Sequence, residues 1–368
     1  MVAETPEHKL KVCIVTISLA GGGAERSTAV LSQMLESKGY EVCIATVVDA
    51  VDYDYSGRLY KIGSGKKAFG IFTTISRLLR FHDFLTKEKF DLIIDNRTRS
   101  KTIKESIYSG FLYKGHKVLY VVRSFKLSNY FPKSHKMAKK MLARAIGVIG
   151  VSNAIAEAVD KRYDYGKAIR IYNPVPLDQI AQQAEKGEVQ GDFIMAMGRL
   201  YDDVKNYSLL IEAYGRSELP AKGIQLILMG DGPDKADLQF KADELGLTKM
   251  IQFLPFNPNP YPHLRAAKCS VLTSHYEGFP RAVIESLAVG TPAVSVDCQS
   301  GPAEIIRDGY NGFLVPNYKP DALAQALNNL IFDPELLSRT TANAKQSVAH
   351  LDIAEIANEW DAIIKEIV

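Results

Sequence analysis

The chain repeats one pattern twice, in which short apolar runs alternate with stretches of helical periodicity. The first half has predicted strands at residues 11–19, 41–48, 90–95, 117–122 and 146–151. The second half has predicted strands at residues 192–197, 224–229, 250–254, 269–273, 292–296 and 313–315. Strands that alternate with helices form a parallel sheet with helices on both faces. The predicted fold class is therefore α/β, with two tandem Rossmann-like, doubly wound domains.

A linker with two prolines separates the halves, at Ile171-Tyr172-Asn173-Pro174-Val175-Pro176. We expect an N-terminal domain over residues 1–172 and a C-terminal domain over residues 173–350. A last helix over residues 351–368 carries apolar residues at helical spacing and is expected to pack back toward the first domain. Ligands bind at the carboxyl ends of parallel strands, so two facing domains predict an active site in the cleft between them.

Charge is distributed unevenly between the two halves. Residues 1–172 hold 29 Lys and Arg against 16 Asp and Glu, and residues 106–156 hold nine basic side chains without an acidic one. This asymmetry indicates an anionic partner for the first half, namely nucleic acid, an anionic membrane surface or a substrate that carries phosphate. No apolar run is long enough to span a membrane. The polar N-terminal segment MVAETPEHKLKV is not a signal peptide, which predicts a cytoplasmic protein.

Three glycines, Gly21 to Gly23, follow the first predicted strand and precede a helix. Glycine lets the backbone approach a ligand closely, and the helix N-terminus offers N–H groups to a phosphate. Asp49 lies near the end of the second predicted strand, where a nicotinamide enzyme keeps its ribose-binding acid. The N-terminal segment alone therefore allows an NAD(P)-dependent oxidoreductase, or a turn with a purely structural role.

The segment His-Tyr-Glu-Gly-Phe-Pro-Arg-Ala-Val-Ile-Glu at residues 275–285 is the most informative part of the second half. Glu277 lies in a loop after a predicted strand, and Pro280 suits the first turn of the helix that follows. Gly278 and Phe279 place N–H groups at the positive end of that helix, where an anion binds. Glu285 lies more than one turn into the helix. The two carboxylates could bind hydroxyl groups at the two ends of a sugar nucleotide, with its diphosphate between them; otherwise they are solvated glutamates at a helix start.

Two cations, Arg199 and Lys205, follow Gly198 and the first predicted strand of the second half. Fixed cations at a strand end can neutralise a diphosphate leaving group, which is the work of a metal ion in other enzymes. Asp52-Tyr53-Asp54 has the Asp-x-Asp pattern of a metal site but is expected to lie in a loop far from the donor motifs. Asp202-Asp203 are interpreted as turn residues. We expect no metal and no other cofactor.

Seven segments resemble the retaining family 4 glycosyltransferases, which have the GT-B fold of two Rossmann-like domains. The resemblance spans nearly the whole chain and is most specific in the second half. It implies that Glu277 contacts the donor sugar, that Glu285 contacts the ribose, and that the glycine loop lies beside the donor phosphates and the acceptor. The segments are GGGAER (21–26), VSNAIAEAV (151–159), IYNPV (171–175), GRLYDDVKNYSLLIEAY (198–214), LILMGDGPD (226–234), HYEGFPRAVIESLAVGTPAV (275–294) and SGPAEIIRDGYNGFLV (300–315).

The function that the resemblance implies is transfer of a hexose or N-acetylhexosamine from a nucleotide diphosphate sugar, by family habit a UDP-sugar. The acceptor is then a membrane-linked glycan or glycolipid in surface polysaccharide or glycan assembly. The predicted catalytic residues are Glu277, Arg199 and Lys205. The predicted donor-binding residues are these three with Gly22, Gly23, Gly198, Gly278, Phe279, Pro280 and Glu285.

The first half departs from the family at one position. Many members have a histidine after the strand that ends here at Val122, whereas this chain has Arg123, which could bind a substrate phosphate instead. Arg123 and Lys126 are the predicted acceptor-side residues. The basic, aromatic stretch at residues 123–144 predicts peripheral attachment to an anionic membrane at its cytoplasmic face, unless it is only a solvated basic helix. A non-enzymatic nucleic-acid binder would also explain the basic half, but the sequence has no recognisable nucleic-acid module, and nucleic acid is not an expected partner.

Overall fold

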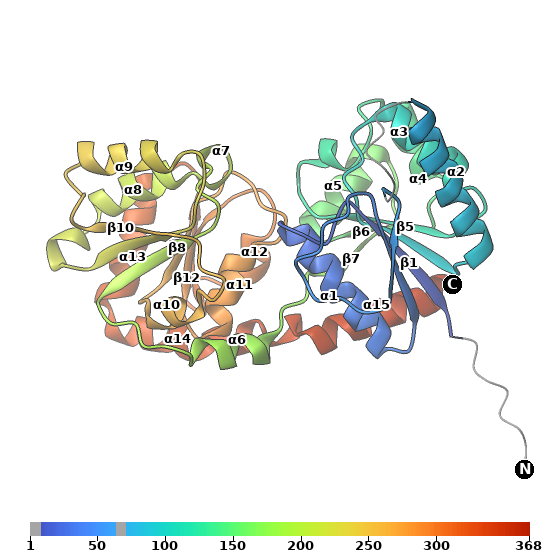
Figure 1. The fold of residues 1–368 in the computed structure, drawn as a ribbon. Coiled ribbons are helices and arrows are strands. Elements are labelled where there is room, and N and C mark those ends of the chain that lie inside the picture. The colour runs from blue at the N-terminus through green and yellow to red at the C-terminus, as the bar shows by residue number, and fades with distance from the viewer. Residues whose placement is uncertain (1–8, 64–70) are drawn as a thin grey trace, which may run out of the picture. The chain divides into compact units, whose positions relative to one another are not determined.

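Two parallel sheets, each covered by helices, organise the chain in the computed structural model, which describes residues 9–63 and 71–368 (Figure 1). Unit 1 comprises Met1–Pro174 with Ile353–Val368, and unit 2 comprises Val175–Asp352. Residues 1–8, which contain most of the polar segment at the N-terminus, lie outside the described part. Among the described residues, no helix is both long and apolar enough to cross a membrane.

Unit 1 is built on a seven-stranded parallel sheet in the order β3-β2-β1-β4-β5-β6-β7. Its central strands are rich in Val and Ile and are buried on both faces, as expected of a parallel sheet between helices. The strands are β1 (Lys11–Thr16), β2 (Glu41–Thr46), β3 (Arg58–Lys61), β4 (Leu92–Asp95), β5 (Val118–Val122), β6 (Gly147–Gly150) and β7 (Ala168–Arg170). The helices are α1 (Gly23–Ser37), α2 (Ile71–Glu88), α3 (Thr102–Ile107), continued by a π-helical stretch (Tyr108–Leu112), α4 (His135–Leu142), α5 (Asn153–Tyr163) and α15 (Ile353–Ile367).

Unit 2 is built on a six-stranded parallel sheet in the order β10-β9-β8-β11-β12-β13. Its core joins the strands to the buried faces of α8 and α13. The strands are β8 (Phe193–Met197), β9 (Gln225–Met229), β10 (Ile251–Leu254), β11 (Ser270–Leu272), β12 (Ala293–Asp297) and β13 (Gly312–Pro316). The helices are α6 (Leu177–Ala184), α7 (Asp202–Lys205), α8 (Tyr207–Arg216), α9 (Lys235–Glu244), α10 (Tyr261–Ala266), α11 (Arg281–Ala288), α12 (Pro302–Ile305), α13 (Pro320–Phe332) and α14 (Pro334–Ser347).

The predicted α/β class with two Rossmann-like halves is confirmed, and each predicted strand forms within a few residues of its expected bounds. Strands β3 and β7 were not predicted. Both are short, lie at the two edges of the unit 1 sheet and are partly exposed, so neither carries the apolar run that marks a buried strand.

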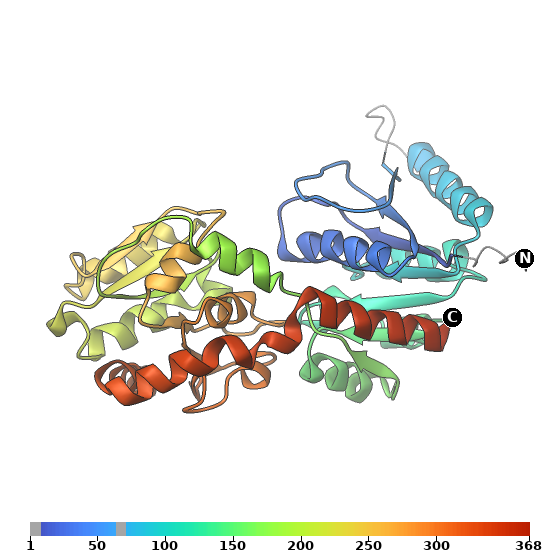
Figure 2. The same ribbon diagram turned by 90° about the horizontal axis from the view of Figure 1, so that it is seen from below.

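The last helix, α15, belongs to unit 1 although it follows unit 2 in the sequence, and it packs beside α1 (Figure 2). The Tyr40 hydroxyl donates a hydrogen bond to Asp361 at 2.7 Å, and Arg170 forms an ion pair with Glu359 at 2.9 Å. Trp360 is buried in the same helix. The sheet and α15 therefore form one core in unit 1.

Candidate functional site

Glycines bring the loops after β8 and β9 together at the carboxyl edge of the unit 2 sheet. Gly198 directly follows β8 and has a φ of +146°, and Gly230 directly follows β9. A Cβ atom on Gly230 would lie only 1.9 Å from the Gly198 carbonyl oxygen, and one on Gly198 would lie 3.1 Å from the Tyr207 hydroxyl. Only glycine fits this close approach. Gly198, a predicted donor-binding residue, therefore shapes the backbone at this strand end.

An ion pair joins two of the predicted catalytic residues at the same edge. The Lys205 Nζ atom at the end of α7 lies 2.7 Å from Oε1 of Glu277, and the Ser274 hydroxyl donates to the same oxygen at 2.7 Å. The Lys205 and Glu277 side chains are 22% and 14% exposed. The Thr273 hydroxyl also donates to the Lys205 carbonyl, at 3.0 Å. The sequence indicated Lys205 only as a cation for a diphosphate, and its pairing with Glu277 was missed.

Arg199, the other predicted catalytic cation, is exposed in the loop after β8, directly after Gly198. Its guanidinium carbon lies 5.8 Å from the centroid of the Tyr201 ring. Within residues 9–63 and 71–368, no carboxylate forms an ion pair with it. Arg199 therefore carries an uncompensated positive charge near the carboxyl end of β8, where an anion can bind.

The loop before α11 is tightly held, and Glu285 lies buried inside the helix. The Ser300 hydroxyl donates to the Gly278 carbonyl at 2.8 Å, and the Phe279 side chain is buried. Glu285 Oε1 accepts hydrogen bonds from Arg281 Nε at 3.3 Å and Nη2 at 2.9 Å. Pro280 was expected in the first turn of the helix, but it is the residue before the helix, at the N-cap position, and α11 begins at Arg281. The two carboxylates Glu277 and Glu285 therefore flank the start of one helix, and each forms an ion pair with a basic side chain.

The glycine loop of unit 1 lies between β1 and α1, which begins at Gly23 with Gly22 at its N-cap position. The Gly21 N–H donates to Asp52 Oδ2 at 3.1 Å, and the Tyr53 hydroxyl donates to the Gly21 carbonyl at 3.1 Å. The expectation that the Asp-x-Asp segment lies far from the donor motifs is therefore wrong for this loop. The cause is the pairing of β1 with β2, which brings the loops after both strands together. Asp49 forms an ion pair with Lys61 at 2.8 Å.

Arg123 follows β5 and is held by two asparagines. Its Nε atom donates to Asn96 Oδ1 at 2.7 Å, and its Nη1 atom donates to Asn173 Oδ1. Amide oxygens carry no net charge, so these contacts orient the guanidinium without neutralising it. Lys126, the other predicted acceptor-side residue, is exposed in the loop that follows. The sequence did not reveal Asn96 or Asn173 as partners, although Asn96 directly follows β4 and Asn173 lies in the IYNPV segment.

Comparison with known proteins identifies the chain as a glycosyltransferase. The model for glycosyl transferases group 1 matches residues 178–347, which is nearly all of unit 2. A Campylobacter jejuni protein, N-acetylgalactosamine-N,N'-diacetylbacillosaminyl-diphospho-undecaprenol 4-alpha-N-acetylgalactosaminyltransferase, is 26% identical over 95% of this chain and 98% of its own length. The chain is a glycosyltransferase with the GT-B fold, and the group 1 match covers its unit 2.

Solved structures show the same fold for this glycosyltransferase. Anabaena Alr3699/HepE in complex with UDP has a TM-score of 0.78 and 19% sequence identity, with 97% of this chain and 100% of that chain covered. A glycosyltransferase from Rickettsia africae has a TM-score of 0.78 and 18% identity, with 98% of each chain covered. Both structures are below 25% identical to this chain, and what they share with it is the GT-B fold over nearly its whole length.

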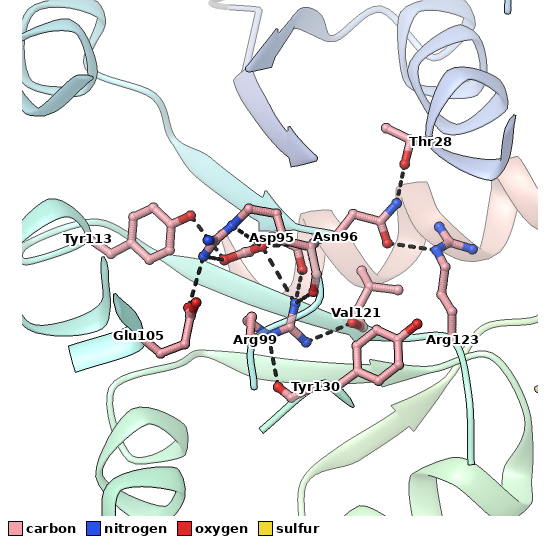
Figure 3. Close-up of polar contacts among 10 residues, drawn as sticks. Thr28, Asp95, Asn96, Arg99, Glu105, Tyr113, Val121, Arg123 and Tyr130 are labelled. Atoms are coloured by element: carbon pink, nitrogen blue, oxygen red, sulfur yellow. Dashed lines mark hydrogen bonds and ion pairs between the residues drawn. The ribbon is translucent and has the colours of Figure 1, made fainter. Parts of the chain in front are cut away.

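Unit 1 of the glycosyltransferase also contains a buried group of charges that the sequence did not reveal, the buried charge cluster, formed by Asp95, Arg97, Arg99 and Glu105 (Figure 3). Asp95 Oδ2 lies 2.7 Å from Arg97 Nη2 and accepts a hydrogen bond from the Tyr113 hydroxyl at 3.0 Å. Glu105 Oε2 lies 3.0 Å from the same arginine nitrogen. The Arg99 guanidinium donates to four backbone carbonyls, those of Asp95, Arg97, Val121 and Tyr130.

The two acids of the buried charge cluster respond in opposite directions. Burial raises the pKa of Asp95, but the charges of Arg97 and Arg99 outweigh it and hold that pKa below its usual value. Burial dominates at Glu105 and raises its pKa, because Arg97 already neutralises Asp95 and compensates Glu105 only in part. Asp95 is therefore the ionised centre of the cluster. Its charge holds the carboxyl end of β4 together, and Asn96, which accepts a hydrogen bond from Arg123, is the next residue.

Proposed function

We propose that this glycosyltransferase transfers a hexose or N-acetylhexosamine from a UDP-sugar, with retention of anomeric configuration, to a membrane-linked glycan or glycolipid. The name of the Campylobacter relative, which matches nearly the whole chain, supports an amino sugar and a lipid diphosphate acceptor. The UDP complex of the Anabaena neighbour supports a uridine nucleotide. The reaction would serve surface polysaccharide or glycan assembly.

The observation that carries this proposal is the Lys205–Glu277 ion pair beside the uncompensated Arg199. When a donor diphosphate binds, Lys205 and Arg199 offer it two positive charges, and Glu277 is released toward the sugar. Negative charge develops on the diphosphate as the glycosidic bond breaks, so fixed cations stabilise the transition state more than the ground state. The two cations therefore do the work of a metal ion, and we propose a reaction without metal or other cofactor.

We propose that the enzyme attaches to the cytoplasmic face of a membrane through basic residues of unit 1. Lys136, Lys139 and Lys140 on α4 are exposed, whereas Met141 of the same helix is buried in the core. A helix with this distribution binds an anionic surface through charge rather than by insertion. Sedimentation with anionic vesicles should show binding that weakens as salt rises. Equal binding to neutral vesicles, or no binding to anionic ones, contradicts the attachment.

Titration calorimetry of the whole protein with UDP, GDP, NAD and an oligonucleotide tests the donor. We expect UDP to bind, also in the presence of EDTA. NAD and the oligonucleotide should not bind. Binding of NAD alone would favour an oxidoreductase, and binding of the oligonucleotide alone would favour a nucleic-acid binder. NMR of the product's anomeric proton tests retention. Activity that disappears in EDTA and returns with Mg²⁺ or Mn²⁺ contradicts the metal-independent reaction.

A further inference from the structure

Unit 1 contains an apolar pocket that the proposed donor chemistry does not use. It has a volume of about 680 Å³, which is within the range of small-molecule sites. Helices α2 and α3, which Figure 1 shows at one edge of unit 1, form two of its walls. Its apolar lining comes from Val47, Ile62, Leu78, Ile103, Ile107 and Tyr108.

The charged side chains that line this pocket are all basic within the described part of the chain: Arg77, Lys101 and Lys104. The Arg77 Nε atom is buried, and no described residue provides it with a hydrogen-bond acceptor. Burial and the nearby charge of Arg97 lower the pKa of Lys104. Buried donors without acceptors destabilise a fold, and a bound anion would supply the missing acceptors.

The buried charge cluster holds the basic side of the pocket in place. Arg97 lies over the Tyr108 ring, with its guanidinium carbon 3.6 Å from the ring centroid, and binds Glu105 of α3 at 3.0 Å. Tyr108 lines the pocket, and Lys104 lies next to Glu105 in the same helix. The α3 side of the pocket wall is therefore fixed to the end of β4.

We propose that this pocket binds a polyprenyl diphosphate, the lipid part of the acceptor, with its first isoprene units against the apolar lining and its diphosphate at Arg77, Lys101 and Lys104. An apolar lining selects a hydrocarbon, and three cations without an acid select an anionic head group. Both requirements are met by an amphiphile of this class. The inference rests on the proposed function, in which the acceptor is lipid-linked.

Calorimetry of the whole protein without vesicles tests the ligand, with inorganic pyrophosphate, geranyl diphosphate, farnesyl diphosphate and farnesol as probes. We expect affinity to rise about tenfold or more from geranyl to farnesyl diphosphate, because each added isoprene unit buries further apolar surface. Pyrophosphate and farnesol should bind more weakly than farnesyl diphosphate, since each lacks one half of the amphiphile. Pyrophosphate that binds as tightly as farnesyl diphosphate overturns the proposal.

Two pairs of variants locate the ligand. Thr74→Trp fills the pocket from an exposed position on α2, and its control Ser76→Trp changes an exposed residue of the same helix outside the pocket. Lys104→Met removes one cation, and its control Lys114→Met removes an exposed cation elsewhere in unit 1. We expect Thr74→Trp and Lys104→Met to weaken farnesyl diphosphate at least about tenfold, and the controls to leave it unchanged. Equal affinities within each pair overturn the site.

Measuring UDP binding on the same samples separates this inference from the proposed function. None of the four substituted residues is a predicted donor-binding residue, either in unit 2 or in the glycine loop of unit 1, so all four variants should bind UDP as the wild-type protein does. UDP binding without prenyl diphosphate binding refutes the pocket and leaves the proposed function standing. Absence of UDP binding refutes the proposed function itself. Variants that weaken vesicle binding but not farnesyl diphosphate would make the pocket a membrane contact and refute the inference.

Discussion

Charged residues follow topologically equivalent strands in the two units, and their surroundings differ. Strand β4 pairs beside β1 in unit 1, and β11 pairs beside β8 in unit 2. At the end of β4, Asp95 and its two arginines are fully buried. After β11, Glu277 and its partner Lys205 remain partly exposed. The same strand end therefore carries an internal charge cluster in one unit and an accessible ion pair in the other.

This difference separates a structural from a functional use of charge. A buried pair has lost its water, so removing one partner leaves an uncompensated charge at a high cost in free energy. A partly exposed pair keeps some water and gains little from its own attraction, so its members can exchange each other for a ligand. We therefore expect substitutions in the buried charge cluster to affect folding and substitutions at Glu277 to affect turnover.

Asp95→Asn should produce the largest effect, because it leaves Arg97 and Arg99 buried without their main counter-charge. We expect a loss of about 3–5 kcal/mol in the free energy of unfolding of unit 1. Trp360, the single tryptophan of the chain, lies in unit 1, so its fluorescence during denaturation reports this transition. The exposed pair Asp49–Lys61 provides the control, and Asp49→Asn should cost less than about 1 kcal/mol. Equal losses in the two variants would contradict a special role for burial.

Glu277→Gln should reduce turnover with little effect on folding. We expect kcat to fall by about 10²–10³-fold, since the proposed role of this carboxylate is at the sugar, where positive charge develops. Affinity for free UDP should stay nearly unchanged, because Lys205 remains available to the diphosphate. Steady-state kinetics with calorimetry measures both. Ser274→Ala, which removes only a hydrogen bond to Glu277, is the matched control and should have a much smaller effect on kcat.

Glu285→Gln should weaken the binding of UDP itself, by about 1–3 kcal/mol for a lost charged hydrogen bond. The resemblance implies the ribose as the partner of Glu285; the ribose does not react, so such a contact contributes equally to the ground state and the transition state and appears mainly in KM. Calorimetry with UDP measures the loss. The assignment of the two carboxylates is reversed if Glu277→Gln loses UDP and Glu285→Gln keeps it.

Glu105→Gln should have the smallest effect, about 1 kcal/mol or less at neutral pH, because glutamine can still accept a hydrogen bond from Arg97. The raised pKa of Glu105 in the folded state gives the effect a pH dependence. Because the pKa of Glu105 is higher in the folded state than its ordinary value of 4.5, its protonated form stabilises the fold at pH values below 4.5. This contribution is lost as the pH rises through the folded-state pKa. The free energy of unfolding of the wild-type protein should therefore fall relative to that of Glu105→Gln as pH rises above about 4.5. Denaturation at several pH values measures this, and the opposite slope contradicts it.

The sequence predicted the sheets well because buried parallel strands are continuous apolar runs. The sequence also placed Glu277 and Glu285 around a helix start, because the two residues are only eight positions apart and belong to one local segment. It could not predict the pairing of Lys205 with Glu277, because these two residues lie 72 positions apart in the sequence and meet only when the sheet forms. The segment Asp-Asn-Arg-Thr-Arg at residues 95–99 has the composition of an exposed loop. Only the packing of α3 and of the Tyr130 loop around it buries both arginines.

The position of α15 in unit 1 bears on the order in which the protein can fold during synthesis. The ribosome makes unit 2 after the sheet of unit 1 and before the helix that completes it. Until Ile353–Val368 emerges, the side of the sheet beside α1 lacks Trp360, and Tyr40 lacks its acceptor Asp361. Domains generally fold as units in the order of their synthesis. In this chain unit 2 can finish first, and the first-made unit remains incomplete until Ile353–Val368 has been translated.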